Sequence, residues 1–268
     1  MTHPWPEMKW WNSGERQIVE EKIDDLEVKK VVCNPDKKHL YKALSATKQA
    51  DVRVCIMGQD PYPTSIHATG IAFSIPRVLQ PRDWPQTLRI VLGEYHSDLG
   101  YDLPSHGDLS RWTSQGVLLW NAIPSCQSGS SLSNDWHEWS YLTGEIVSRL
   151  SDQGIVFAFL GAVARAYADK VDLTRNRVIL TSHPSPRGNN GKTPFTGSRL
   201  FSTINARLNE IKLEPIDWEL RDDPRQSHLQ TPSLVRKNVL PNINHADLGG
   251  LKGARLPHRV ESTFSLDL

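Results

Sequence analysis

Four short, almost continuously apolar segments constrain the fold of this chain more than any other feature. They are VRVCIM, GVLLWN, GIVFAFLG and RVILTS, at residues 52–57, 116–121, 154–161 and 177–182. Each segment is rich in branched residues and stops at Gly, Asn or Ser, which is typical of strands buried on both faces. We therefore expect a central, four-stranded, mostly parallel sheet.

The stretches between these segments have helical periodicity. Apolar residues recur every three or four positions between Trp84 and Gly100, over 135–151 and over 197–211. Asp135 is the predicted N-terminal cap of the second helix. Strands that alternate with helices predict an α/β three-layer sandwich, with helices flanking both faces of the sheet. Functional loops of such folds gather at the carboxyl ends of the strands.

The chain divides into two parts by composition. Residues 1–220 contain every predicted strand and helix and are long enough for one large core. From residue 221 onward Pro, Gly and Asn are too frequent for long helices. We interpret 221–268 as a C-terminal extension, partly ordered or packed on the domain, with a docking segment for a partner as the alternative.

Composition excludes several classes of site. The cysteines Cys33, Cys55 and Cys126 have no metal-ligand spacing, which argues against a disulfide framework, a zinc site or an iron–sulfur cluster. Neither a signal-peptide pattern nor an apolar run of about 18 residues is present. We expect an intracellular protein, in the cytoplasm or in the nucleus of a eukaryotic host, neither secreted nor membrane-bound. The net charge of +1 alone does not indicate nucleic acid.

Three polar phrases follow predicted strands and should share one edge of the sheet: GQDPYP at 58–63, WNAIPS at 120–125 and SHPSPRG at 182–188. Taken singly, each has a structural explanation, because Asp in a turn commonly binds backbone amides. Together with GIAFS at 70–74, in this order and spacing, they resemble the motifs of family 1 uracil-DNA glycosylases. The resemblance extends from about Cys33 through PIDWEL to Leu220.

The resemblance implies a monofunctional hydrolase that flips uracil out of DNA, breaks its N-glycosidic bond and leaves an abasic site, the first step of base excision repair. It implies no metal and no organic cofactor. The expected partner is uracil-containing single- or double-stranded DNA, and a proteinaceous glycosylase inhibitor is a further candidate. We expect a monomer.

The resemblance also implies the catalytic groups. Asp60 would orient the attacking water and stabilise positive charge on the deoxyribose. His183, in its neutral form, would donate a hydrogen bond to uracil O2 as negative charge accumulates there. The backbone of Gln59 would complete this oxygen site.

Three further residues suit a uracil pocket by their chemistry. Phe73 offers a flat ring for stacking. The side-chain amide of Asn121 can accept from uracil N3–H and donate to O4, whereas cytosine presents the reverse pattern. Tyr62, stiffened by Pro61 and Pro63, would crowd the C5 position and exclude the methyl group of thymine.

The remaining candidates would bind the DNA backbone without reading sequence. They are Thr87, Ser185, Arg187, Lys192 and Arg199.

The sequence departs from the family pattern at three positions. Pro63 and Thr69 stand where the family usually has His. Arg187 stands where a Leu normally wedges into the base stack, and its planar guanidinium could fill the same gap by stacking.

The altered loop and the C-terminal extension motivate an alternative function, a DNA-binding or assembly subunit with weak catalysis. The complete set of pocket residues argues against it. A serine hydrolase is disfavoured because no G-x-S-x-G motif is present.

Overall fold

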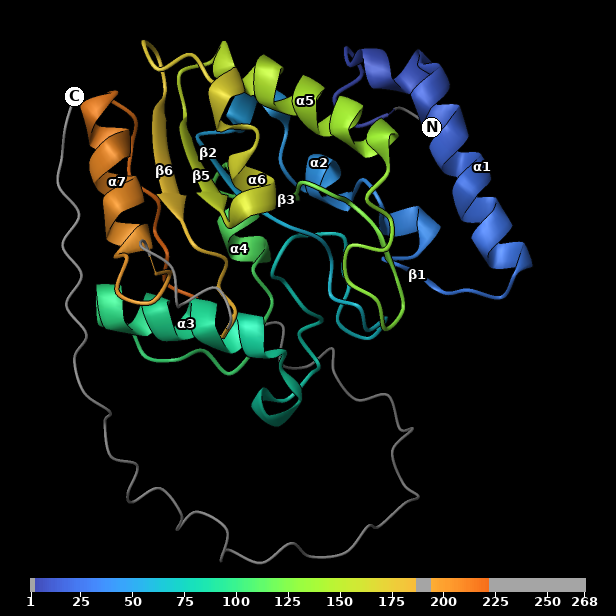
Figure 1. Cartoon of the computed structure of the whole chain (residues 1–268). Coiled ribbons are helices and arrows are strands. Elements are labelled where there is room, and N and C mark those ends of the chain that lie inside the picture. The colour runs from blue at the N-terminus through green and yellow to red at the C-terminus, as the bar shows by residue number, and fades with distance from the viewer. Residues whose placement is uncertain (1–2, 187–193, 222–268) are drawn as a thin grey trace, which may run out of the picture. The chain divides into compact units, whose positions relative to one another are not determined.

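A four-stranded parallel sheet with the strand order β3-β2-β5-β6 forms the centre of the molecule (Figure 1). The structure is a computed structural model and describes residues 3–186 and 194–221. The strands are β2 (Val54–Gly58), β3 (Val117–Asn121), β5 (Val156–Leu160) and β6 (Arg177–Thr181). The predicted parallel sheet is confirmed, and no antiparallel pair interrupts its register within the described residues.

The strands of the sheet differ in how completely they are buried. The central strands β2 and β5 are buried along their whole length, as their continuous apolar sequences predict. The edge strand β6 is different, because only Thr181 among its residues is buried. The expectation that 177–182 is buried on both faces was therefore wrong, because Val178 and Leu180 pack against one core and Ile179 against the other, but all three stay partly exposed.

Helices cover both faces of the sheet, so the predicted three-layer sandwich is confirmed (Figure 1). One core contains residues of α1 (Gly14–Val28), α2 (Lys42–Ala46), α5 (His137–Ser151) and α6 (Ala162–Arg165). The other contains residues of α3 (Gln86–Leu99), α4 (Ser110–Thr113) and α7 (Leu200–Glu210). Successive residues of β2 alternate between the cores, with Cys55 and Met57 in the first and Val54 and Ile56 in the second.

Short elements complete the fold. A two-stranded antiparallel sheet joins β1 (Cys33–Asn34) to β4 (Cys126–Gln127). Single turns of 3-10 helix occur at Lys9–Asn12, Lys37–His39, Gln49–Asp51, Pro81–Asp83 and Ala168–Lys170. None of the helices in the described ranges is long and apolar enough to cross a membrane.

Two predicted helix starts need correction. Helix α5 begins at His137, its N-cap is Trp136, and Asp135 is not the cap. Helix α7 begins at Leu200 because Arg199 has a left-handed backbone with φ of 52°, which cannot continue a helix. The amides of Gly197 and Arg199 instead donate to the buried carboxylate of Glu94 on α3, over 2.6 and 2.7 Å.

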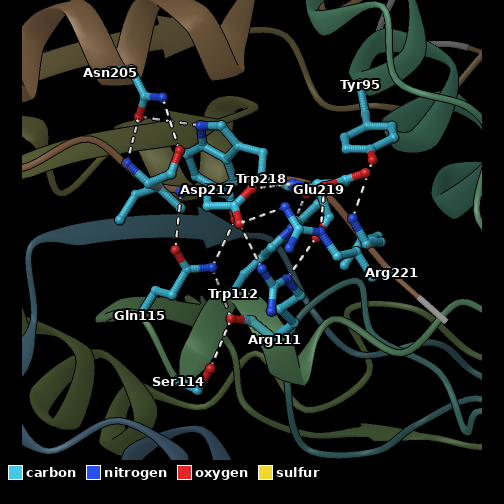
Figure 2. Close-up of polar contacts among 12 residues, drawn as sticks. Tyr95, Arg111, Trp112, Ser114, Gln115, Asn205, Asp217, Trp218, Glu219 and Arg221 are labelled. Atoms are coloured by element: carbon cyan, nitrogen blue, oxygen red, sulfur yellow. Dashed lines mark hydrogen bonds and ion pairs between the residues drawn. The ribbon is translucent and has the colours of Figure 1, made fainter. Parts of the chain in front are cut away.

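The segment after α7 belongs to the core of the domain. Ile216 and Trp218 are buried against α3, α4 and α7. Figure 2 shows Asp217 held from two sides: Arg111 Nη2 donates to its Oδ2 over 2.6 Å, and its own amide donates to Gln115 Oε1 over 2.9 Å. The domain therefore extends at least through PIDWEL, whereas the predicted extension 221–268 lies outside the described residues apart from Arg221.

All three cysteines are buried and free. Burial raises the pKa of the Cys55 thiol to about 12. This residue therefore stays a protonated, unreactive thiol in the core.

Candidate active site

A cavity of about 490 Å³ opens where β2, β3 and β6 end. Most of the predicted site residues line it: Gln59, Asp60, Tyr62, Phe73, Thr87, Asn121, His183 and Ser185. These residues come from separate stretches of the sequence, and the parallel sheet brings them together because its strands all end at this edge.

Gly58 is the last residue of β2 and allows two pocket side chains to approach the sheet closely. A Cβ at this position would lie 2.8 Å from Asn121 Oδ1 and 2.8 Å from Phe73 Cζ. Any other residue would displace one of these groups. The glycine of GQDPYP is therefore required by the packing of the pocket.

Phe73 and Tyr62 fix one another at the side of the cavity. Phe73 has a left-handed backbone with φ of 65°, which is strained for a residue with a bulky side chain. The hydroxyl of Tyr62 donates to the carbonyl oxygen of Phe73 over 2.8 Å. Burial raises the pKa of Tyr62, so this hydroxyl remains a donor at neutral pH. The bond therefore connects Tyr62, which is predicted to crowd the C5 position of uracil, to Phe73, which is predicted to stack on the base.

The side-chain amide of Asn121 faces the same cavity with both of its polar ends available. Asn121 ends β3 beside Gly58 of β2. Among the described residues, none forms a hydrogen bond with this side chain. An unpaired carbonyl oxygen and amide group at a cavity wall can bind the mixed donor–acceptor edge of a planar base.

The carboxylate of Asp60 is held by three donors. Its Oδ2 accepts from Ser131 Oγ and from the amide of Leu132, each over 2.7 Å. Its Oδ1 accepts from Gln59 Nε2 over 3.0 Å. The carboxylate therefore has a defined orientation at the cavity.

His183 lies against the backbone that follows β5. A Cβ on Gly161, whose φ is +92°, would be 2.9 Å from His183 Cβ. Burial lowers the pKa of His183, and the negative charge of Asp60 only partly opposes this effect. The imidazole is therefore neutral at pH 7, as expected, and can donate through one ring nitrogen.

The predicted DNA contacts separate into three groups. Thr87 and Ser185 line the cavity. Arg199 does not line it, and its Nε lies 3.6 Å from Asp98 Oδ1 on α3. Arg187 and Lys192 lie outside the described residues.

Two of the three positions that depart from the family pattern, Pro63 and Thr69, also line the cavity. Thr69 Oγ1 turns back and donates to the carbonyl oxygen of Ser74 over 3.1 Å. The carbonyl oxygen of Pro63 accepts from the amide of Gly129 over 2.7 Å. Both residues therefore stabilise local backbone.

Two lining residues, Ser131 and Leu132, were missed by the sequence analysis. They lie in the stretch SGSSLSN after β4, where Leu132 has a left-handed backbone with φ of 61°. The concentration of Ser and Gly following a strand end was the available signal. Only the backbone of Gln59 was expected to take part, whereas its side chain contacts Asp60.

Across the two described stretches, no three His, Cys, Asp or Glu side chains come together in an arrangement that could hold a metal ion. The polar groups that converge on the cavity are thus carboxylate, imidazole, amide and hydroxyl groups.

Comparison with known proteins agrees with this geometry. Residues 45–209 match the Uracil DNA glycosylase superfamily. A uracil-DNA glycosylase of Acinetobacter baylyi is 35% identical over 205 residues, which are 76% of this chain and 83% of the relative. A uracil-DNA glycosylase of Lacticaseibacillus casei is 38% identical over 188 residues, 69% of this chain and 80% of the relative.

The fold is also found in a solved structure of mimivirus uracil-DNA glycosylase. That structure has a TM-score of 0.68 and 24% sequence identity, and the alignment covers 78% of this chain and 83% of the viral protein. Another mimivirus structure of this kind is in complex with UGI. The sequence match and the shared fold lead to the same conclusion, and the chain belongs to the uracil-DNA glycosylase superfamily.

Proposed function

We propose that this chain hydrolyses the bond between uracil and deoxyribose in DNA, releases free uracil and leaves an abasic site for base excision repair. The observation that carries the proposal is the convergence of Asp60, Asn121 and His183 on one cavity beside the ring of Phe73.

Uracil would be recognised by its edge and its shape. The open amide of Asn121 accepts from N3–H and donates to O4, and a cytosine would leave these groups unpaired at a cost of about 1–3 kcal/mol each. The ring of Tyr62 closes the side where thymine carries its methyl group. Its hydrogen bond to Phe73 supports this assignment, because it makes the wall rigid.

Bond cleavage would depend on a negatively charged carboxylate at Asp60 and a neutral imidazole at His183. As the C1′–N1 bond breaks, its electron pair leaves with uracil and positive charge grows on the sugar. Ionised Asp60 stabilises the sugar and orients the water that adds to C1′. Neutral His183 donates to uracil O2, and electrostatic contributions of this kind are commonly worth about 10²–10³ in rate.

The DNA backbone would be bound around the same opening. The hydroxyls of Thr87 and Ser185 are placed to contact phosphates beside the flipped nucleotide. Arg187, in the proposed wedge role, and Lys192 would add contacts, and Arg199 would need to leave Asp98 to do so.

Several broader properties complete the proposal. The substrate is uracil in single- or double-stranded DNA, and a protein inhibitor could occupy the same groove. The catalytic unit is residues 1–220 acting as a monomer inside the cell, with 221–268 as an extension.

The decisive test is release of base from oligonucleotides that carry one uracil, with thymine and cytosine oligonucleotides as controls. The wild-type chain should release uracil alone, and Asp60→Asn should be slower by about 10²-fold or more. DNA binding without release by either protein would instead support the assembly subunit.

A further inference from the structure

Two segments far apart in the sequence meet at the carboxylate of Asp60. Asp60 follows β2, whereas Ser131 lies in the loop after β4. Ser131 Oγ donates to Asp60 Oδ2 over 2.7 Å, and Gln59 Nε2 reaches both Asp60 Oδ1, at 3.0 Å, and Ser131 Oγ, at 3.5 Å. The three side chains therefore form a ring of hydrogen bonds at the cavity.

The donors are divided unequally between the two oxygens of Asp60. Oδ2 accepts from Ser131 Oγ and from the amide of Leu132, and Oδ1 accepts from Gln59 Nε2 alone among the described residues. Each carboxylate oxygen has about two acceptor positions. Oδ2 is thus fully occupied, and the remaining acceptor position of Asp60 is on Oδ1.

The loop that carries Ser131 is built to hold this geometry. Leu132 has a left-handed backbone, which directs its amide to Asp60. Such strain persists only where surrounding contacts maintain it. Ser133 supplies two of them, because its Oγ accepts from the amide of Gln127 and donates to the carbonyl oxygen of Ser130, each over 2.7 Å.

We infer that Ser131 is a positioning residue for Asp60: its hydroxyl, with the Leu132 amide, fixes Oδ2 so that Oδ1 is the oxygen that holds the attacking water. The inference rests on the proposed function, since Asp60 must act on a water and a sugar. Loss of the Ser131 hydroxyl would leave one donor on each oxygen, and the carboxyl group could then rotate more freely about its last side-chain bond, because that torsion is broad.

This role predicts an effect on the chemical step and little effect on substrate binding. Ser131 contacts the carboxylate, whereas the proposed base-recognition groups, Asn121 and Tyr62, lie on other elements. Small misplacements of a catalytic group can reduce rates by up to about 10²-fold. Because Asp60 keeps two other donors, the expected loss is about tenfold.

The test is release of uracil by Ser131→Ala, Ser131→Thr and Ser130→Ala in the full chain, with kcat and KM from steady-state runs and single-turnover runs to establish that kcat reports the chemical step. Ser130 is the matched control, because it lies next in the loop and its hydrogen bonds with other described residues are made by its backbone. Ser131→Ala should lower kcat about tenfold with KM changed less than about twofold. Ser131→Thr keeps a hydroxyl and should restore most of the rate, and Ser130→Ala should match the wild type.

A double-variant cycle tests whether Ser131 acts through Asp60. In an Asp60→Asn background, Ser131→Ala should change kcat by less than about twofold. A full tenfold effect in that background would overturn the inference, as would wild-type kcat in Ser131→Ala or failure of Ser131→Thr to recover. If the wild-type chain releases no uracil, the proposed function itself fails. That result is distinct from a failure of the inference on Ser131, which requires an active wild-type chain.

Discussion

Gly58 lies so close to Phe73 that a Cβ in place of its hydrogen would come within 2.8 Å of Phe73 Cζ. The same Cβ would be 2.8 Å from Asn121 Oδ1. A single glycine at the end of β2 thus sets the distance between the sheet and two walls of the cavity.

Gly58→Ala should therefore impair uracil binding more than folding. The new methyl group pushes the Phe73 ring or the Asn121 amide into the cavity, so inhibition by free uracil should weaken about tenfold or more, with a stability cost of about 1–3 kcal/mol. Gly93→Ala on α3 is the control, because a Cβ there meets nothing within 4 Å. It should leave uracil inhibition intact and stabilise the helix by up to about 1 kcal/mol. Unchanged uracil inhibition in Gly58→Ala would show that the pocket tolerates the methyl group.

The hydroxyl and the ring of Tyr62 should have separable effects. Tyr62→Phe removes the bond to the Phe73 carbonyl oxygen and should cost about 1–3 kcal/mol, because a buried acceptor loses its partner. It should still reject thymine, since the ring remains. Tyr62→Ala removes the wall and should release measurable thymine from DNA. The comparison requires base-release assays on uracil and thymine oligonucleotides and denaturant unfolding of both variants. Thymine release by Tyr62→Phe would mean that rigidity, and not bulk, excludes the methyl group.

His183 should make the domain less stable in mild acid. Its pKa in the folded chain lies below the ordinary value of 6.5 because it is buried. Below about pH 6.5 the unfolded chain therefore binds more protons, and the free energy of unfolding decreases until the pH passes the folded pKa. Above about pH 6.5 both states are neutral at this residue and it adds no pH dependence.

Urea unfolding between about pH 7.5 and pH 5 checks this sign. Wild-type protein should lose more stability over that interval than His183→Gln, which cannot titrate. Parallel losses in the two proteins would mean that the imidazole is not desolvated. Ring nitrogen chemical shifts give a direct measurement of the same protonation.

The fold could be predicted from the sequence because the strands of a buried parallel sheet appear as continuous apolar runs. The run at Val54–Gly58 is apolar throughout, and this continuity reflects cover on both faces. The same logic overstated the burial of Arg177–Thr181, since a run of apolar residues does not say how completely the flanking helices cover a strand. The cap at Asp135 was wrong because Trp136 keeps an extended backbone and delays the helix.

The cavity residues that follow strand ends were predicted from the sequence, and Phe73 and Thr87 were predicted through the family resemblance, whereas Ser131 and Leu132 were not predicted. Asp60 and Asn121 were visible because each follows a buried run. Ser131 is brought to Asp60 by a loop whose path depends on local bonds such as that from Ser133 to Ser130. No periodicity in the sequence indicates that Ser131 and Asp60 come into contact.

Glu94 should anchor the segment that returns from the HPSP loop to α7. Its buried carboxylate accepts from the amides of Gly197 and Arg199. Glu94→Gln presents an NH₂ group to one of these donors, so one bond becomes a repulsive contact and stability should fall by about 2–3 kcal/mol. Glu21→Gln on the exposed face of α1 should stay within about 0.5 kcal/mol of wild type. Thermal and urea unfolding measure both, and equal stability of the two variants would contradict the anchoring role.

The segment PIDWEL, which ends at Leu220, should be essential to folding, whereas the extension 221–268 should not. Trp218 is 1% exposed, and its carbonyl oxygen accepts from Trp112 Nε1 over 2.8 Å. Trp218→Ala should therefore cost about 3–5 kcal/mol through the cavity that it leaves. Removal of residues 222–268 should retain both the melting temperature and the rate of uracil release. Unfolding of the shortened chain would place part of the extension in the domain core. Normal folding with lost uracil release would assign it to DNA binding.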